Sequence, residues 1–308
     1  MVRTGPVAAG DRLTWEEAVV ALRADPSRLA LVQACYYDDP IEVAAERYRL
    51  SEEWQATLGL VGGGEGRCAL EIGAGRGISS YALASTGWRT VAVEPDSSAI
   101  VGAGAVLSLC RSSGCRVMVT RADGERLPFA EGTFDLVFGR ATLHHARDLE
   151  AMCREVHRVL RPGGRMVFLR EHVIRDNKEL ADFLSGHALH RLYGGERAYR
   201  LGTYVGAIRA AGMNQVACIG PYSSPVNWAP RSRDDILAQV RCDVARIVGK
   251  SAAGAAPIPA LALRAWAVLR NSRDPVPGRH YSFVATKPGP RRRLLPGLAR
   301  RLRQAWLR

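Results

Sequence analysis

The stretch CALEIGAGRGISS, residues 68–80, constrains the fold of this 308-residue chain more than any other segment. An apolar run ends in the carboxylate Glu71. Glycines then follow at alternate positions, Gly73, Gly75 and Gly77, before a segment with the composition of a helix. Glycines between a strand and a helix let the backbone approach a ligand at the helix N-terminus. The stretch therefore predicts a nucleotide-binding loop.

The residues after position 67 alternate between short apolar runs and helical patterns. Near-continuous apolar strands, each followed by a helix, are typical of a parallel sheet covered on both faces. We therefore predict an α/β fold with a Rossmann-like, seven-stranded, mostly parallel sheet and helices on both faces. The predicted strands cover residues 67–72, 90–95, 116–121, 134–140, 165–171, 215–220 and 280–287.

Helical patterns also open the chain. The sequence TWEE at 14–17 fits a capping box, and Ser51 is expected to break a helical stretch over 41–60. Another helix is predicted over 97–113, after the second strand. We divide the chain into an N-terminal helical cap (1–62), an α/β domain (63–289) with helical lid insertions near 173–212 and 228–272, and a basic amphipathic tail (290–308).

Composition narrows the classes of protein that the chain can belong to. No run of eighteen apolar residues is present, so no membrane span is predicted, and the first residues lack the apolar region of a secretory signal. The seven cysteines are scattered, which favours reduced thiols and a cytoplasmic location over a disulfide framework or a zinc cluster. The net charge is +13, and eight basic residues from Lys287 onward leave +5 for the remainder.

Two acidic positions indicate which nucleotide the loop binds. A dinucleotide loop has the pattern G-x-G-x-x-G, but Ile78 occupies the place of its third glycine. Glu71 would repel a pyrophosphate and attract a cationic ligand. S-adenosylmethionine fits this description because it has an ammonium group, a sulfonium and no phosphate. Glu94, at the end of the second predicted strand, can accept both ribose hydroxyls.

Four segments resemble a known family in their order and spacing. LEIGAGRG, VAVEP, ADGERLPFAEGTFDLVFGRATLHH and EVHRVLRPGGRMVF are similar to motifs of class I S-adenosylmethionine-dependent methyltransferases, most closely the small-molecule, type 11-like branch. The resemblance covers about residues 66–172, and HYSFVATK is similar to the family's final antiparallel strand. It implies an enzyme that uses S-adenosylmethionine as its methyl donor.

The resemblance also implies a role for each cofactor-binding residue. The three loop glycines would let the backbone approach the methionine and ribose portions. Glu71 would orient the amino group and Glu94 would bind the ribose. Asp123 would accept from the adenine amine, with the backbone of Gly124 beside the ring. The backbone carbonyl of Arg140 would face the methionine amine.

Candidate bases for the acceptor follow two strands. His144 and His145 follow the fourth predicted strand, and Glu171 and His172 follow the fifth. We take Glu171, His172 and His145 as the catalytic candidates, while a structural role is favoured for the LHH motif itself. Because GRATLHH lacks the Asn/Asp-Pro-Pro-aromatic pattern of enzymes that methylate bases, nucleic acid is not an expected partner.

The segment HALHRLYGGERAY belongs to the predicted lid. His187 and His190 share a helix face and, with His172 or Glu171, offer an alternative as a metal site. We favour a lid without metal. Other polar and aromatic residues suited to a sugar or polyketide-like acceptor are Tyr193, Glu196 and Tyr199.

The function predicted from the sequence is methylation of a small molecule or saccharide, preferably at a hydroxyl. The alternative is a non-catalytic protein of the same fold that acts on a membrane or nucleic acid through its basic tail. Residues 291–308 place leucines and a tryptophan at helical spacing among arginines, a pattern typical of peripheral contact with an anionic membrane face. The sequence gives no oligomeric state.

Overall fold

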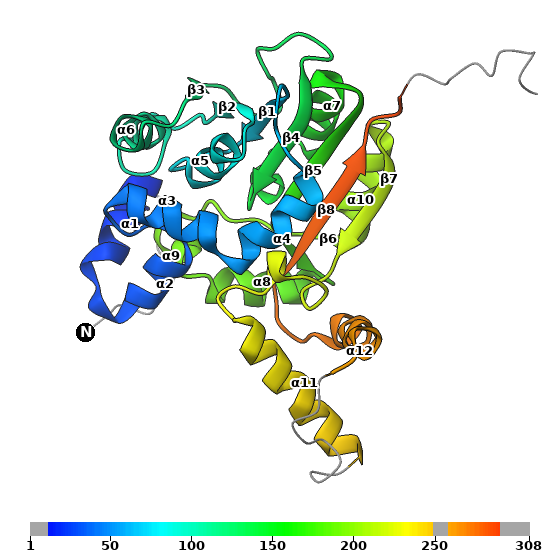
Figure 1. Cartoon of the computed structure of the whole chain (residues 1–308). Coiled ribbons are helices and arrows are strands. Elements are labelled where there is room, and N and C mark those ends of the chain that lie inside the picture. The colour runs from blue at the N-terminus through cyan, green and yellow to red at the C-terminus, as the bar shows by residue number, and fades with distance from the viewer. Residues whose placement is uncertain (1–11, 249–257, 290–308) are drawn as a thin grey trace, which may run out of the picture.

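A computed structural model describes residues 12–248 and 258–289, and it centres on one mixed sheet (Figure 1). The strand order is β3-β2-β1-β4-β5-β8-β7, with β6 pairing to β5 off this path. Pairing is parallel from β3 to β5, and β8 is antiparallel to both of its neighbours. The strands are β1 (Cys68–Ile72), β2 (Arg89–Val93), β3 (Val117–Thr120), β4 (Phe134–Arg140), β5 (Leu160–Ile174), β6 (Tyr199–Arg200), β7 (Asn214–Ile219) and β8 (Arg279–Thr286).

This architecture confirms the predicted α/β class, but the predicted count of seven strands was wrong. The described residues contain eight strands, because the two-residue strand β6 pairs with Val173 and Ile174. That pairing exists because β5 continues past the predicted end at residue 171. Arg170 adopts a left-handed backbone (φ 60°) at a break in register with β8, and the strand resumes beyond it.

The position of two catalytic candidates changes as a result. Glu171 and His172 were predicted to follow the fifth strand, but both lie within it. They pair with Tyr281 and His280 of β8. Strand pairing therefore fixes the backbone of these two residues more firmly than a loop would.

Helices cover both faces of the sheet, and the alternation of β4 shows why. Leu136 and Phe138 pack with α4, α5 and α6, whereas Val137 between them packs with α7 and α10 on the opposite face. Phe134 joins the cluster of Val137 because the register of β4 shifts between Phe134 and Leu136. The helices are α1 (Trp15–Ala24), α2 (Leu29–Ala34), α3 (Ile41–Leu50), α4 (Glu52–Val61), α5 (Ile78–Ser85), α6 (Ala103–Ser113), α7 (Leu149–Val159), α8 (Asn177–Gly186), α9 (Ala188–Tyr193), α10 (Leu201–Ala210), α11 (Arg233–Val248) and α12 (Ala260–Arg273), with short 3₁₀ helices η1 (Pro26–Arg28), η2 (Leu143–His145) and η3 (Pro225–Asn227).

Local signals set several helix ends. Thr14 and Glu17 form the predicted capping box of α1, and Ser51 caps α4 after ending α3, as predicted. The helix predicted over 97–113 begins only at Ala103. Asp96 accepts a hydrogen bond from the Ser98 amide (2.7 Å), and this turn diverts the chain before the helix begins.

The N-terminal helices pack against the lid insertion. Apolar residues of α1, α2 and α9 share one buried cluster, and the Leu13 amide donates to the Leu192 carbonyl (3.1 Å). Arg76 of the glycine loop reaches into this cap, donating to the carbonyls of Tyr36 (2.8 Å) and Asp38 (2.7 Å). The cap and the loop are therefore joined by polar bonds.

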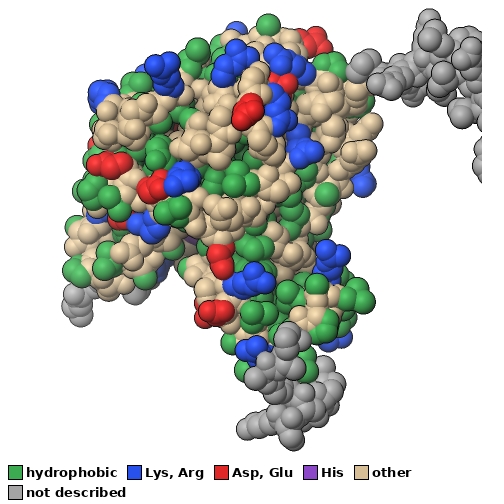
Figure 2. Space-filling model, viewed as in Figure 1, with side chains coloured by type: hydrophobic (Ala, Val, Ile, Leu, Met, Phe, Trp, Pro, Cys, Tyr) green, Lys and Arg blue, Asp and Glu red, His purple; other side chains and the backbone are tan. Residues whose placement is uncertain are grey.

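Helices α11 and α12 project from the body (Figure 1). Hydrophobic side chains gather over this projection in Figure 2, and Leu261, Val268 and Leu269 of α12 are exposed. Within residues 12–248 and 258–289, no helix combines the length and apolarity needed to cross a membrane. The predicted tail, with its proposed membrane contact, lies outside the described residues.

Candidate functional site

The glycine loop follows β1 directly, and its backbone requires glycine. Gly73, Gly75 and Gly77 have φ angles of 67°, 53° and 80°, which side chains other than glycine rarely adopt. A Cβ on Gly73 would lie 2.7 Å from Cγ2 of Thr142, and one on Gly77 would lie 2.9 Å from Cγ1 of Val106. The loop is thus a backbone-lined cradle at the carboxyl edge of the sheet, where such folds bind ligands.

Two buried carboxylates flank this cradle. Glu94 accepts hydrogen bonds from the amides of Gly75 (2.8 Å) and Asp96 (3.0 Å), which leaves lone pairs on both oxygens. Glu71 is bonded by the Ser80 hydroxyl, and burial raises the pKa of Glu71 to about 8. Burial also raises the pKa of Glu94. In their ionised form both carboxylates would attract a cationic nucleoside and repel a pyrophosphate.

The other predicted cofactor residues lie along the same edge. Asp123 follows β3 and is exposed. Gly124 lies against Met152, since a Cβ there would be 2.5 Å from the terminal methyl carbon Cε of that side chain. The carbonyl of Arg140 ends β4 and accepts from Oγ1 of Thr142 (3.2 Å). The structure therefore brings all of the predicted cofactor positions to one edge of the sheet.

The side chain of Arg140, unlike its carbonyl, belongs to a buried group of charges. Its Nε lies 2.6 Å from Oε1 of Glu53, whose side chain is 2% exposed. The guanidinium lies 5.4 Å from the ring centroids of Tyr36 and Tyr48. Arg170 shares the same carboxylate at 3.7 Å. This buried group of charges joins the cap helix α4 to β4 and β5.

A buried polar cluster lies beside the glycine loop. Glu171 accepts from the amides of Thr142 and His144, each at 3.0 Å, and lies 2.7 Å from Nδ1 of His144. Ala141, at the end of β4, adopts a left-handed backbone (φ 54°), which turns the chain toward Glu171. Oγ1 of Thr142 donates to the carbonyl of Ile72 (3.2 Å), so a single residue separates the cluster from β1.

Glu196, from the loop before β6, completes the cluster. One of its oxygens lies 3.5 Å from Nε2 of His144 and 3.8 Å from Nε2 of His145, and the other accepts from the Tyr193 hydroxyl (2.7 Å). Burial opposes a charge on His144, but hydrogen bonds to Glu171 and Glu196 outweigh this and raise the pKa of His144 to about 9. At Glu196 burial is outweighed by the hydrogen bond to His144 and by the charges of His145, His144 and His187, which lower the pKa of Glu196.

The three catalytic candidates differ in their access to a substrate. Glu171 is 0% exposed and engaged by three donors, whereas the side chain of His145 is 40% exposed. Nδ1 of His172 lies 2.7 Å from the Gly278 carbonyl, and burial holds the pKa of His172 well below its ordinary value. His145 is therefore the candidate with the most open path to an acceptor.

Sequence reasoning missed three contributors to this site. Arg76, inside the glycine motif, was not singled out, although it is 6% exposed and its side chain is bonded to the cap. His144 was assigned a structural role, and Glu196 was taken only as a lining group. An arginine between two glycines was a usable signal. The contact between His144 and Glu196 gave no such signal, because 52 positions separate the two residues in the sequence.

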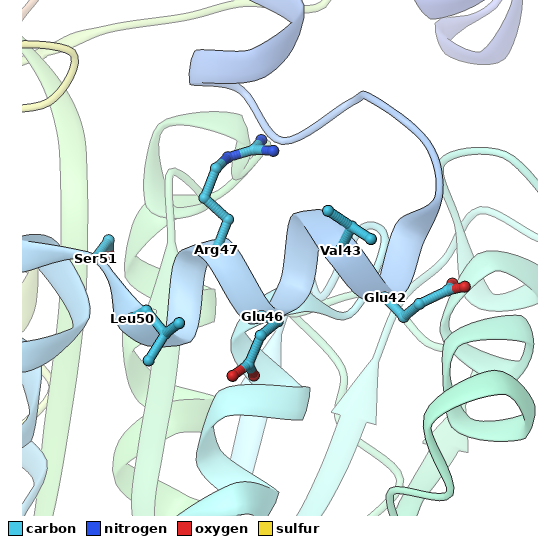
Figure 3. Close-up of a pocket in the computed structure, with 6 residues that line it drawn as sticks. All are labelled: Glu42, Val43, Glu46, Arg47, Leu50 and Ser51. Atoms are coloured by element: carbon cyan, nitrogen blue, oxygen red, sulfur yellow. The ribbon is translucent and has the colours of Figure 1, made fainter.

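A surface groove on the outer side of α3 is unrelated to this site (Figure 3). Two of its charged residues are already in ion pairs, Glu46 with Arg49 and Arg47 with Asp38. None of the predicted site residues contributes to it. The residues that line it are Glu42, Val43, Glu46, Arg47, Leu50 and Ser51.

A sheet with this strand order, a glycine loop after β1 and a carboxylate, Glu94, after β2 is typical of nucleoside-binding proteins of the Rossmann-like class. Residues 70–168 match the family profile described as "Methyltransferase domain". Residues 70–168 thus form a methyltransferase domain of the class I S-adenosylmethionine-dependent type, as the motif resemblance predicted, and S-adenosylmethionine is the cofactor of that class.

Curated relatives match over the same region. A demethylmenaquinone methyltransferase of Mycolicibacterium paratuberculosis is 35% identical over 113 residues, covering 37% of this chain and 45% of that protein. One from Mycobacterium marinum is 34% identical over 145 residues, covering 42% and 59%. The chain thus spans about half the length of the curated relatives it matches.

Solved structures share the fold at low identity. The phosphoethanolamine N-methyltransferase 2 of Haemonchus contortus has a TM-score of 0.52 at 16% identity, covering 90% of this chain and 60% of that one. The [4+2]-cyclase SpnF has a TM-score of 0.50 at 18% identity, covering 93% and 89%. Similarity at this level establishes the fold alone.

The raised pKa of Glu71 predicts a pH-dependent affinity for the cofactor. Below pH 8 the carboxyl is mostly neutral, and as the pH rises through 8 it ionises and attracts the ligand's ammonium group. We expect the affinity for S-adenosylhomocysteine, relative to that of Glu71→Gln, to rise about tenfold between pH 6.5 and 8.5. Calorimetry measures both proteins, and the ratio cancels the titration of the ligand's own amine. A constant ratio would contradict the assigned role of Glu71.

Proposed function

We propose that this protein transfers a methyl group from S-adenosylmethionine to a hydroxyl of a small molecule or saccharide. The observation that carries the proposal is the buried cluster of Glu171, His144 and Glu196 beside the glycine cradle. Thr142 contacts both parts, since it lies against Gly73 and donates its amide hydrogen to Glu171. An acceptor bound at the cluster would therefore lie next to the cofactor.

The residues around the acceptor divide into two roles. We assign contact with the acceptor to His145, whose side chain is 40% exposed at the edge of the cluster. Glu171 acts as a positioning residue, because its three hydrogen bonds fix His144 and the turn after β4. Glu196 carries a buried negative charge toward which a hydroxyl proton is drawn.

The bound cofactor would supply a methyl group already activated by the sulfonium. The protein has to hold the acceptor oxygen in line with that methyl group and exclude water. Helix α1 assists, because Trp15 lies over the glycine loop, 3.6 Å from where a Cβ on Gly75 would be. Its contacts with α9 make the cap and the lid one cover over the site.

The names of related proteins support a small acceptor. Two matched relatives are demethylmenaquinone methyltransferases, and the Haemonchus neighbour is a phosphoethanolamine N-methyltransferase. We carry over the class of acceptor, a small molecule, and none of the individual substrates. The cyclase among the fold neighbours is the reason that the reaction itself requires a direct test.

The test measures transfer of labelled methyl from S-adenosylmethionine to fractionated small-molecule and saccharide extracts. We expect transfer by the wild type, and a 10²–10³-fold lower kcat in His145→Ala with an unchanged KM for the cofactor. His157→Ala is the matched control, because that histidine lies on α7 outside the cluster. Cofactor binding without transfer to any fraction would favour the alternative of a binding protein. Full turnover in His145→Ala would remove that residue from the mechanism.

A further inference from the structure

Four of the seven histidines of the chain gather around one buried carboxylate. The side chains of His144 and His145 form one group with Glu196, and those of His172 and His187 form a second. In each group the potential ligand atoms lie within 4.8 Å of one another. Two imidazoles and one carboxylate are a frequent ligand set for divalent transition metals.

The histidine rings near Glu196 are oriented by their other nitrogen. Nδ1 of His144 lies 2.7 Å from Glu171, and Nδ1 of His145 lies 3.4 Å from the Gly195 carbonyl. A carbonyl can only accept, so the proton of His145 lies on Nδ1 and its Nε2 keeps a free lone pair. Both Nε2 atoms face the same oxygen of Glu196. Metal-binding histidines are held in this way by carboxylates and carbonyls.

We propose that Nε2 of His144, Nε2 of His145 and Oε2 of Glu196 bind one divalent ion of the zinc class. Ligands about 2.0–2.1 Å from a tetrahedral zinc lie about 3.4 Å from one another. The Glu196 oxygen lies 3.5 Å from His144 and 3.8 Å from His145, so small side-chain movements would close the site. The second group is less suited, because the Glu196 oxygen nearest to His187 lies 4.0 Å away and already accepts from Tyr193.

The surroundings of Glu196 support a cation at this position. Its side chain is 5% exposed, and among the described residues no lysine or arginine lies within 4.0 Å of it. Within the part of the chain that the structure describes, only histidines lie close enough to balance its charge, and a bound ion would take over that role. The exposed side of His145 would leave a coordination position open, as in catalytic rather than structural zinc sites.

The use of this ion rests on the function proposed above. A divalent ion that binds the acceptor oxygen makes the hydroxyl proton easier to lose. With Glu196 engaged by the ion and by Tyr193, the proton passes to solvent instead of toward Glu196, and the freed electron pair on oxygen forms the new bond to carbon. The methyl–sulfur bond breaks with its electrons left on sulfur, so no oxidant or further reactant is needed.

The experiment measures metal binding by the full chain, freed of metal by a chelator, without cofactor or acceptor. Zinc titration by calorimetry should show one ion per chain, and cobalt should give the visible absorption of a tetrahedral site. We expect at least 100-fold weaker binding in His145→Ala and in Glu196→Gln, with His157→Ala unchanged. His145 is partly exposed, so its variant should retain the fold, which circular dichroism verifies.

Three outcomes would overturn the site. These are no stoichiometric zinc binding, wild-type affinity in His145→Ala, or loss of binding in His187→Ala while His145→Ala binds normally. The first would indicate a cluster held by protons alone, and the last would assign the ion to the second group. Since no methyl donor is present, failure of the proposed methyl transfer cannot produce any of them.

Discussion

Replacing Glu94 with alanine is expected to weaken the binding of S-adenosylmethionine roughly 100-fold or more. Hydrogen bonds to a charged group contribute about 1.5–3 kcal/mol each, and Glu94 would accept two from the ribose. The variant also loses the bonds to the amides of Gly75 and Asp96 that shape the cradle. Calorimetry with purified protein measures the change directly.

Two further variants separate these effects. Glu94→Gln keeps one acceptor oxygen and should show an intermediate loss, and Glu65→Ala removes an exposed acid before β1 and should bind as the wild type does. Binding by a correctly folded Glu94→Ala within threefold of the wild type would refute the ribose assignment. Binding of a dinucleotide in place of S-adenosylmethionine would refute the electrostatic reasoning about the loop.

The second large effect is expected at Glu53. This residue is the carboxylate partner of the buried Arg140, and Arg170 lies 3.7 Å from it. Glu53→Ala leaves two buried guanidinium groups without their counter-ion, and we expect the free energy of unfolding to fall by about 3–5 kcal/mol. Urea denaturation followed by circular dichroism measures the difference.

The neighbouring residue provides the control. Glu52 is exposed in the same first turn of α4 and accepts one hydrogen bond, from the Arg233 amide (3.0 Å), so Glu52→Ala should lower the free energy of unfolding by about 1 kcal/mol or less. Replacing both Glu53 and Arg140 with methionine should recover part of the loss, because fewer charges then remain unpaired. A cost below about 1 kcal/mol for Glu53→Ala would show that water reaches this group.

Much of the fold was predictable because its signals are local. Strand runs, the glycine motif and the capping box of α1 each lie within a few consecutive residues, and the structure places them as expected. The errors arose where a local turn or an unusual backbone angle overrode the helix or strand that the sequence pattern predicted. The turn from Asp96 to Ser98 delayed the start of α6, and the left-handed Arg170 let β5 continue.

The site was predictable only in part, for a related reason. The motifs brought Glu71, Glu94 and the glycines together because consecutive parallel strands end at the same edge. The contact between His144 and Glu196 requires the segment after β5 to fold back toward β4. No local sequence pattern predicts that arrangement. Likewise, the position of the Glu171 carboxylate is set by the pairing of β5 with β8, which the residues next to Glu171 do not indicate.

The bonds from Arg76 to the carbonyls of Tyr36 and Asp38 join the glycine loop to the N-terminal helical region. If the glycine loop moves when the cofactor is released, either these hydrogen bonds break or residues 36–38 move with the loop. We therefore expect the residence time of the cofactor to depend on this segment as well as on the loop. A sheet and loop transplanted into another scaffold are expected to keep recognition of the ligand and to exchange it at a different rate.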